Sequence, residues 1–366
     1  MTGNLFRAPI KLSPPATFIL CLLLLNIWSL TCLYSSLHLG GEFRDPSIFY
    51  KQILWVAISW LVLIVFCAIN YRVYYDFAYI FYGFNLLLLL AVELGGRAAM
   101  GAQRWISFGG FNFQPSELSK VAVIFLTARI LSSSRNRDFL RGFVFPLVLI
   151  LLNALIIFKQ PDLGTALIVI FLFFAIGLIS RVPRIYFISA IIIGVLASPF
   201  AWHVLKDYQK KRLIVFINPA ADPLGAGYAI IQSKIAIGSG KIMGKGFLAG
   251  TQNQFNFLHE RHTDVIFTVV AEEWGFFGSL FLLVIYWLIL RSILDAAGQC
   301  HDAFGQLLAA GIGSLFFLHV FINMGMTLSI LPVVGVPLIF MSYGGSNLII
   351  NFMLAGIFLN ICRTSR

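Results

Sequence analysis

The sequence predicts an all-α, polytopic integral membrane protein, a helical bundle of about ten transmembrane helices with one long extracytoplasmic loop. Of its 366 residues, 59% are hydrophobic and 11% are charged, whereas a soluble domain carries about 25% charged residues. The apolar residues also fall in runs near the ~20 residues that cross the hydrocarbon core of a bilayer. Water could not solvate such a surface, so lipid must cover much of it.

Ten apolar runs define the expected transmembrane helices. The first follows Arg7 and Lys11, is too long for the core of a signal peptide and lacks a cleavage site, so we expect it to stay in the membrane. Residues 1–366 are expected to form a single multi-pass membrane domain. The expected spans are 16–37, 52–69, 74–92, 116–132, 142–158, 163–180, 185–202, 264–290, 304–328 and 345–362.

Basic residues predict the orientation, because Lys and Arg gather in short cytoplasmic segments. With the N-terminus inside, the short inner segments carry more Lys and Arg than the short outer ones, so both termini are expected in the cytoplasm. The longest connection, residues 203–263, is basic but near the length at which charge stops governing translocation. We therefore expect 203–263 to be a basic extracytoplasmic loop.

Ionisable residues are densest where this loop enters the eighth apolar run. Glu260, Arg261 and His262 precede Asp264 there. Partial desolvation at such a mouth would suit Asp264 as a general base. A helix cap is the alternative, because an Asp side chain accepts hydrogen bonds from the free N–H groups of a first turn. Composition alone favours the cap.

Two more acidic groups are expected on the same side of the membrane. Glu117 and Lys120, three apart, share one face at the start of a membrane helix. They are either a structural pair or functional groups, because an unpaired charge at such a place usually faces the bundle or a cavity. Asp162 lies in a Pro-Asp-x-Gly connection that a turn alone would explain. With Asp264 and several Arg or Lys on the same face, these carboxylates could hold a divalent cation and a diphosphate.

The long loop contains glycine-flanked lysines. Residues 228–237 are expected to form a short interfacial helix that carries Lys234, and Lys245 follows between two glycines. The pattern resembles a nucleotide-binding loop only superficially, because Ser239 and Gly246 stand where that motif needs Gly and Ser or Thr. We exclude an NTPase, although such lysines can present charge and backbone N–H groups to a phosphate.

Two adjacent glutamates lie inside the eighth helix. Glu272 and Glu273 are expected ~12–14 Å below Asp264 at about 1.5 Å per residue. The 100° step between neighbours prevents both from lining one cavity with Asp264. We expect at least one of them to make a buried contact with another helix, in preference to a proton relay.

Several blocks of sequence stand out along nearly the whole chain, namely 101–105, 113–117 with Lys120, 160–165, 222–228, 232–240, 250–252, 260–264 and 331–337. In this order they resemble the SEDS family (shape, elongation, division and sporulation proteins). Its elongation-type peptidoglycan glycosyltransferases match better than the division-type paralogue, which stays an alternative. Departures such as His259 in place of Pro and Val265 in place of Phe remove no proposed chemical group.

The resemblance implies a substrate and a reaction. A SEDS enzyme of this type polymerises lipid II, a disaccharide-peptide on undecaprenyl diphosphate, into glycan strands at the outer face of the bacterial cytoplasmic membrane, and releases undecaprenyl diphosphate. It implies that Asp264 is catalytic: it takes the proton of the acceptor sugar's 4-hydroxyl as this attacks the donor's anomeric carbon. The expected substrate-binding residues are Arg104, Trp105, Glu117, Lys120, Asp162, Lys234, Lys245, Glu260, Arg261 and His262.

The resemblance also implies partners and a cofactor. We expect a class B penicillin-binding transpeptidase, other membrane proteins of the elongation complex and membrane lipid, and no nucleic acid. A divalent cation, Mg²⁺ or Mn²⁺, is expected with unknown ligands. The alternative from another class is a lipid II flippase, which polar residues in apolar runs, such as Glu272, Asn323 and Asn347, would suit. A flippase should carry such groups along the whole depth, whereas these cluster outside. A scaffold that only binds a transpeptidase would leave the outer carboxylates unexplained.

Overall fold

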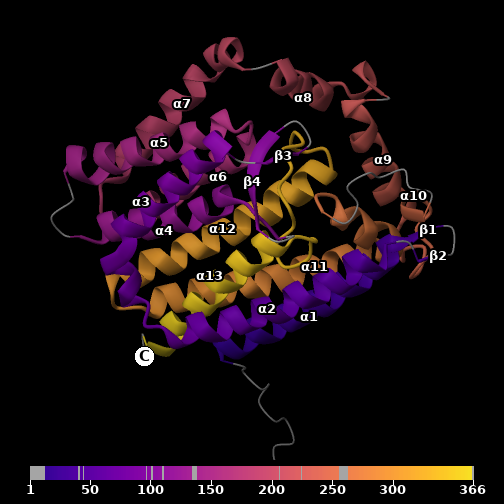
Figure 1. Cartoon of the computed structure of the whole chain (residues 1–366), viewed down its shortest axis with the longest axis horizontal. Coiled ribbons are helices and arrows are strands. Elements are labelled where there is room, and N and C mark those ends of the chain that lie inside the picture. Colours follow the sequence, from indigo (N-terminus) through magenta and orange to yellow (C-terminus); the bar gives the residue numbers. More distant parts are fainter. Residues whose placement is uncertain are drawn as a thin grey trace, which may run out of the picture.

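The computed structural model describes residues 13–39, 42–43, 45–95, 97–99, 102–108, 111–133, 138–205, 207–223, 225–254 and 263–364. Long apolar helices dominate this part of the chain (Figure 1). They match the ten expected spans in order, and the prediction of a polytopic helical membrane bundle is confirmed. The helices are α1 (Pro14–Leu37), α2 (Pro46–Ala68), α3 (Arg72–Gly95), α4 (Pro115–Ser132), α5 (Phe145–Lys159), α6 (Leu163–Ile179), α7 (Arg184–Val204), α11 (Ile266–Gln299), α12 (Ala303–Thr327) and α13 (Gly345–Thr364).

Seven helices of the described chain are long and apolar enough to cross a membrane by themselves, and α6 and α7 carry shorter apolar stretches. The tenth helix, α4, includes Glu117, Lys120 and Arg129, and its composition alone would not identify it as a membrane span. It is nevertheless almost wholly buried between α3, α6 and α12. Glu117 and Lys120 are buried there, so the position of α4 rather than its composition allows it to lie at membrane depth.

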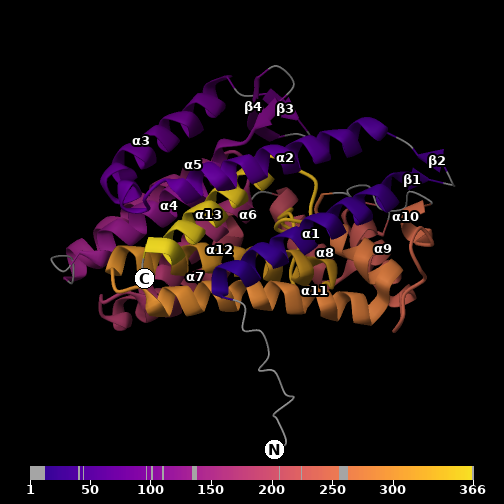
Figure 2. The same ribbon diagram turned by 90° about the horizontal axis from the view of Figure 1, so that it is seen from below.

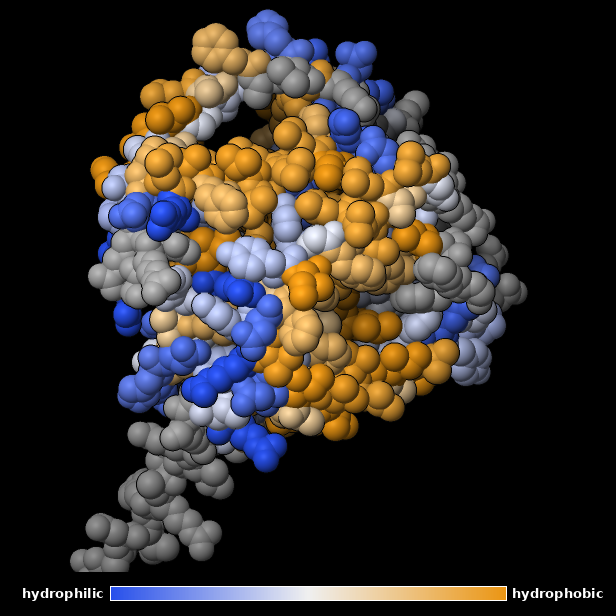
Figure 3. Space-filling view, turned by 60° about the vertical axis from the view of Figure 1, so that its left-hand side comes forward, coloured by the Kyte–Doolittle hydropathy of each residue, from blue (hydrophilic) through white to orange (hydrophobic). Residues whose placement is uncertain are grey.

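The bundle has a buried centre and an apolar outside. α12 and α13 are largely buried, whereas α2 and α3 expose most of their surface. Leu94 on α3 is 89% exposed, as expected for a side chain that faces lipid tails. Figure 3 shows broad apolar areas on the surface of the molecule. Figure 2 shows α1 running alongside α11, and the two helices pack against each other.

Short strands in two connections were missed by the sequence analysis. β1 (His38–Leu39) pairs antiparallel with β2 (Glu42–Phe43) between α1 and α2. Between α3 and α4, β3 (Arg97–Ala99), β4 (Ala102–Phe108) and β5 (Phe111–Phe113) form an antiparallel sheet in that order. All five are confined to connections, so the fold remains a helical bundle.

The long connection between α7 and α11 is partly helical. It contains α8 (Asp207–Ile217), the 3₁₀ turn η2 (Pro219–Ala221), α9 (Ala226–Ser239) and α10 (Thr251–Gln254). The interfacial helix expected at 228–237 corresponds to α9. Figure 1 shows α7, α8 and α9 following the outer edge of the bundle towards β1 and β2, and α9 packs on α11. Similarly, the π-helical turn η1 (Phe139–Val144) leads into α5.

Candidate active site

Asp264 lies in the turn that enters α11, where its side chain is half-buried. Two side chains hold the backbone of this turn. The Asn323 amide of α12 donates to the Asp264 carbonyl at 2.7 Å, and the Ser342 hydroxyl donates to the Thr263 carbonyl at 2.6 Å. The N-cap position of α11 belongs to Val265, not to Asp264. Asp264 thus lies one residue before the N-cap, at the mouth of the helix, and both its catalytic role and the cap alternative stay predictions.

The non-helical segment 331–337 lies against the Asp264 side chain. Gly335 has a φ of 75°, and a Cβ on it would lie 3.2 Å from Asp264 Oδ2. The Asn323 amide also donates to the Val336 carbonyl at 2.8 Å, so one side chain ties this segment to the turn of Asp264. Irregular backbone within a membrane bundle must be covered by protein or line a cavity. Here it forms one wall around the candidate base.

Glu117 and Lys120, at the start of α4, form a buried ion pair. They are 5% and 1% exposed. Lys120 Nζ donates to the two carboxylate oxygens at 2.8 and 2.9 Å and lies 3.0 Å from His319 Nε2. The Asn347 amide donates to Glu117 Oε2 at 2.7 Å. The pair is thus neutral as a unit and well supplied with hydrogen bonds, as burial of charge requires. A contact with substrate stays a prediction.

The buried ion pair is connected to the Asp264 region through α12. His319 Nδ1 lies 3.1 Å from the Pro337 carbonyl, at the end of the segment that contacts Asp264. His319 and Asn323 are four residues apart and therefore share one face of α12. Both side chains hold residues 336–337 from that face. A continuous polar network thus reaches from the ion pair to the wall beside Asp264.

Arg104 and Asp162 organise the connection between α5 and α6. Asp162 is the N-cap of α6 and accepts from the Thr165 N–H at 3.2 Å. Arg104 on β4 donates to the Gln160 carbonyl at 2.9 Å, and its guanidinium lies 4.0 Å from Asp162. Trp105 follows on β4 and is half-buried. The turn interpretation of Asp162 is confirmed by the cap, and the substrate-binding roles of Arg104, Trp105 and Asp162 stay predictions.

Asp162 also contacts the start of α4. The Ser116 hydroxyl and the Gln114 amide both lie 3.3 Å from Asp162 Oδ2. Ser116 is adjacent to Glu117, so the structure brings the beginnings of α4 and α6 together, as the sequence analysis expected for two of its three carboxylates.

The predicted cationic residues of the long loop have different surroundings. Lys234 is exposed on α9. Lys245 forms an ion pair with Glu272 at 2.7 Å, and this glutamate side chain is 1% exposed. The remaining predicted substrate-binding residues, Glu260, Arg261 and His262, lie outside the described residues. The expected buried contact of the glutamate pair is confirmed, because the Ser35 hydroxyl of α1 donates to Glu273.

Asp264, Glu117 and Asp162 do not share a metal site in this structure. Glu117 is neutralised by Lys120, and Asp162 is engaged as a helix cap. Across the described residues, no three His, Cys, Asp or Glu side chains come close enough together to hold a metal ion. The expected divalent cation and its ligands stay a prediction.

The structure adds residues that the sequence analysis did not assign to this site. Arg212 on α8 donates to the Val333 carbonyl at 3.3 Å, so a cation of the long loop reaches the segment beside Asp264. Asn323 was considered only as part of a translocation path, and His319 was not singled out. Polar residues four apart in an apolar run were the available signal for these two.

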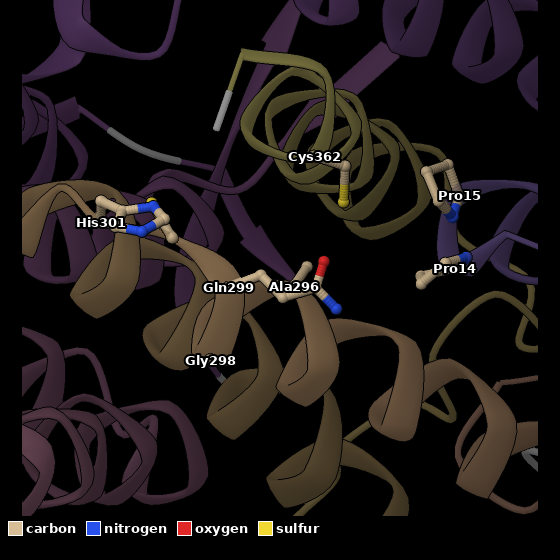
Figure 4. A pocket seen from close by; sticks show the side chains of 8 residues that line it. Pro14, Pro15, Ala296, Gly298, Gln299, His301 and Cys362 are labelled. Atoms are coloured by element: carbon tan, nitrogen blue, oxygen red, sulfur yellow. The ribbon is translucent and has the colours of Figure 1, made fainter. Parts of the chain in front are cut away.

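A separate cavity of about 380 Å³ lies at the other end of the bundle. It is lined where α1 begins and where α11 and α13 end, by Pro14, Gln299 and Cys362 among others (Figure 4). Because Asp264 lies at the opposite end of α11, this cavity is not part of the candidate active site.

The chain is similar in sequence to several peptidoglycan glycosyltransferases. The chain is 41% identical over 350 residues to the peptidoglycan glycosyltransferase MrdB of Escherichia coli K12, covering 94% of this chain and 92% of that protein. It is 31% identical over 385 residues to the peptidoglycan glycosyltransferase RodA of Treponema pallidum, covering 86% and 89%. A probable peptidoglycan glycosyltransferase FtsW of Geobacter metallireducens is 39% identical over 338 residues, covering 89% and 88%.

Solved structures show the same fold. One chain of a peptidoglycan synthase complex, described as coordinating polymerization and crosslinking, superimposes with a TM-score of 0.80 at 29% identity, covering 94% of this chain and 96% of that one. The rod shape determining protein RodA of Thermus thermophilus gives 0.71 at 26% identity, covering 95% and 96%. The family model for FtsW, RodA and SpoVE, described as cell cycle protein, matches residues 15–366. The chain belongs to the FtsW/RodA/SpoVE family.

Proposed function

We propose that this chain is a peptidoglycan glycosyltransferase that polymerises lipid II into glycan strands during cell elongation. The observation that carries the proposal is the position of Asp264. Its carboxylate is half-buried at the start of α11, beside Gly335, in a turn held by Asn323 and Ser342. A carboxylate with its backbone fixed in this way is suited to act as a general base.

The reaction has two requirements. A base must take the proton of the attacking hydroxyl, and the diphosphate must leave the donor sugar. The 4-hydroxyl of the acceptor sugar attacks the anomeric carbon of the donor and gives its proton to Asp264. The new glycosidic C–O bond forms while the bond from that carbon to the diphosphate oxygen breaks, so undecaprenyl diphosphate leaves with the bonding electrons. Attack opposite the leaving group inverts the donor sugar and requires no covalent enzyme intermediate.

Cationic side chains are expected to stabilise the leaving diphosphate, whose negative charge grows in the transition state. Arg212 supports this assignment, because its guanidinium reaches residue 333 in the segment that contacts Asp264. Arg104 is a second candidate, although it also holds the α5–α6 connection. Arginine suits this role because its planar group can bind two phosphate oxygens at once.

We also propose that the active site faces the cell exterior and that both termini are cytoplasmic. The excess of Lys and Arg in the short segments on the side of the termini supports this orientation. A class B transpeptidase is the proposed partner. The similar chain from a complex that coordinates polymerization and crosslinking supports this partner class.

The test is polymerisation of lipid II by the purified full-length chain, alone and with a class B transpeptidase. Wild type should make glycan chains, and Asp264→Asn should lose at least about 100-fold in rate, since a positioned general base contributes about 10²–10⁴-fold. Asp295→Asn is the matched control, because Asp295 is half-exposed at the other end of α11. Transport of lipid II across vesicles without polymer formation would support the flippase instead.

A further inference from the structure

α11 is interrupted at Gly275, whose φ of 64° and ψ of −154° are not helical. This backbone conformation is essentially restricted to glycine. The break leaves an outer segment, residues 266–274, and a longer inner segment, residues 276–299. The outer segment directly follows Asp264, so whatever holds that segment also determines where the candidate base lies.

The loop 240–254, which follows α9, fills the break. In a continuous helix the carbonyls at 272 and 273 would accept from the N–H groups four residues later. Here the loop supplies those donors, and the freed N–H groups donate back to the loop. The four crossing hydrogen bonds are Lys245 N–H to Glu272 O (3.0 Å), Gly246 N–H to Glu273 O (3.0 Å), Phe276 N–H to Lys241 O (3.0 Å) and Phe277 N–H to Ile242 O (3.3 Å).

The loop and the helix are in backbone contact. A Cβ on Gly275 would lie 2.3 Å from the Gly244 nitrogen, and one on Gly244 would lie 2.1 Å from the Glu273 carbonyl oxygen. A Cβ on Gly240 would lie 1.9 Å from the Ala271 carbonyl oxygen. Side chains at these positions would force the two backbones apart. The glycines therefore make the exchange of hydrogen bonds possible.

The Glu272 side chain binds this loop at two places. It is 1% exposed, and its Oε1 accepts from Lys245 Nζ at 2.7 Å, from the Gln252 N–H at 3.1 Å and from the Thr251 hydroxyl at 3.3 Å. A Cβ on Gly250 would lie 3.0 Å from Oε2. One carboxylate thus binds the loop at residue 245 and again at 251–252, and the loop packs directly on it.

We propose that Glu272 is a positioning residue for Asp264, acting through its ion pair with Lys245. The proposal rests on the proposed function, in which Asp264 is the general base. Glu272 lies eight positions after Asp264, about 12 Å along a helix, so Glu272 does not touch the reacting atoms. It fixes the outer segment of α11 on the loop, and the outer segment in turn fixes the base. A loosely held base lowers kcat far more than it changes KM.

Glu272→Gln and Lys245→Met test the proposal, because each removes one charge of the pair at nearly constant volume. Lipid II polymerisation should lose about 10–100-fold in kcat, with KM for lipid II within about 3-fold of wild type. Lys245→Arg keeps the charge, so its kcat should lie within about 3-fold of the wild-type value. Asp295→Asn, which removes half of an exposed ion pair on the inner segment of α11, should behave as wild type.

Hydrogen exchange provides a readout that does not depend on activity. In Glu272→Gln, amide exchange should rise at least about tenfold in residues 241–254 and 266–277, while α12 and α13 keep their wild-type protection. A raised KM with unchanged kcat would overturn the proposal, because Lys245 would then bind substrate directly. Uniformly faster exchange, or wild-type kcat in both variants, would overturn it as well. If wild type itself makes no glycan, the proposed function fails, and the exchange data still decide whether Glu272 holds the outer segment.

Discussion

Lys120→Met removes the positive charge of the buried ion pair and keeps a side chain of similar length. Lys120 is 1% exposed and lies 2.8 and 2.9 Å from the oxygens of Glu117 and 3.0 Å from His319. The variant leaves the Glu117 carboxylate, 5% exposed, with the Asn347 amide and no opposite charge. Breaking a buried pair in this way costs about 3–5 kcal/mol, because the remaining charge is buried and uncompensated. We expect that loss in the free energy of unfolding.

The assay is reversible unfolding in mixed detergent and SDS micelles, followed by circular dichroism. Lys211→Met is the matched control, since Lys211 pairs with Asp222 at the same 2.8 Å but is 59% exposed. An exposed pair contributes about 0–1 kcal/mol, so this variant should stay near wild type. The double variant Glu117→Gln/Lys120→Met removes both charges and should unfold at a higher SDS fraction than Lys120→Met. If Lys120→Met and Lys211→Met lose the same small amount of unfolding free energy, the reasoning is refuted.

Three further variants probe the wall beside Asp264. Asn323→Ala removes the shared donor of two carbonyls and should lower kcat for glycan polymerisation about 10-fold and stability by about 1–3 kcal/mol. Gly335→Ala should lower kcat at least about 10-fold, because its φ of 75° and a Cβ 3.2 Å from Asp264 both disfavour a side chain; Gly83→Ala, with nothing within 4 Å, is its control. Arg212→Gln should lower kcat for glycan polymerisation about 3–10-fold, because the leaving diphosphate gains charge in the transition state, and should weaken the salt dependence of KM for lipid II.

Each of these has an outcome that contradicts it. Wild-type kcat from Asn323→Ala would show that Ser342 alone suffices to hold the turn. Full activity of Gly335→Ala would mean that the segment 331–337 moves away from Asp264 in the working enzyme. A salt dependence of KM unchanged by Arg212→Gln would place the leaving diphosphate elsewhere.

The bundle was predictable because its determinants are local. Most spans need only a run of apolar residues of sufficient length, which the sequence shows directly. The exception is α4, which lies at membrane depth because its neighbours bury Glu117 and Lys120. Asp264 could also be identified from the sequence, since a carboxylate at the edge of an apolar run is unusual. The break in α11 was not, because Gly275 in an apolar helix has no distinctive signature until the loop that fills the break is in place.

The sequence by itself determined the fold class, the number and order of the spans and the position of the candidate base, because hydrophobic length and charge placement act along the chain. Only the tertiary structure decided the partners of the buried charges. Lys120 meets His319 across 199 residues, Asn323 meets Asp264 across 59, and Glu272 meets Lys245 across 27. Such pairs form because a charge or donor inside the bundle must find its partner wherever packing brings one within reach, and packing is a property of the whole chain.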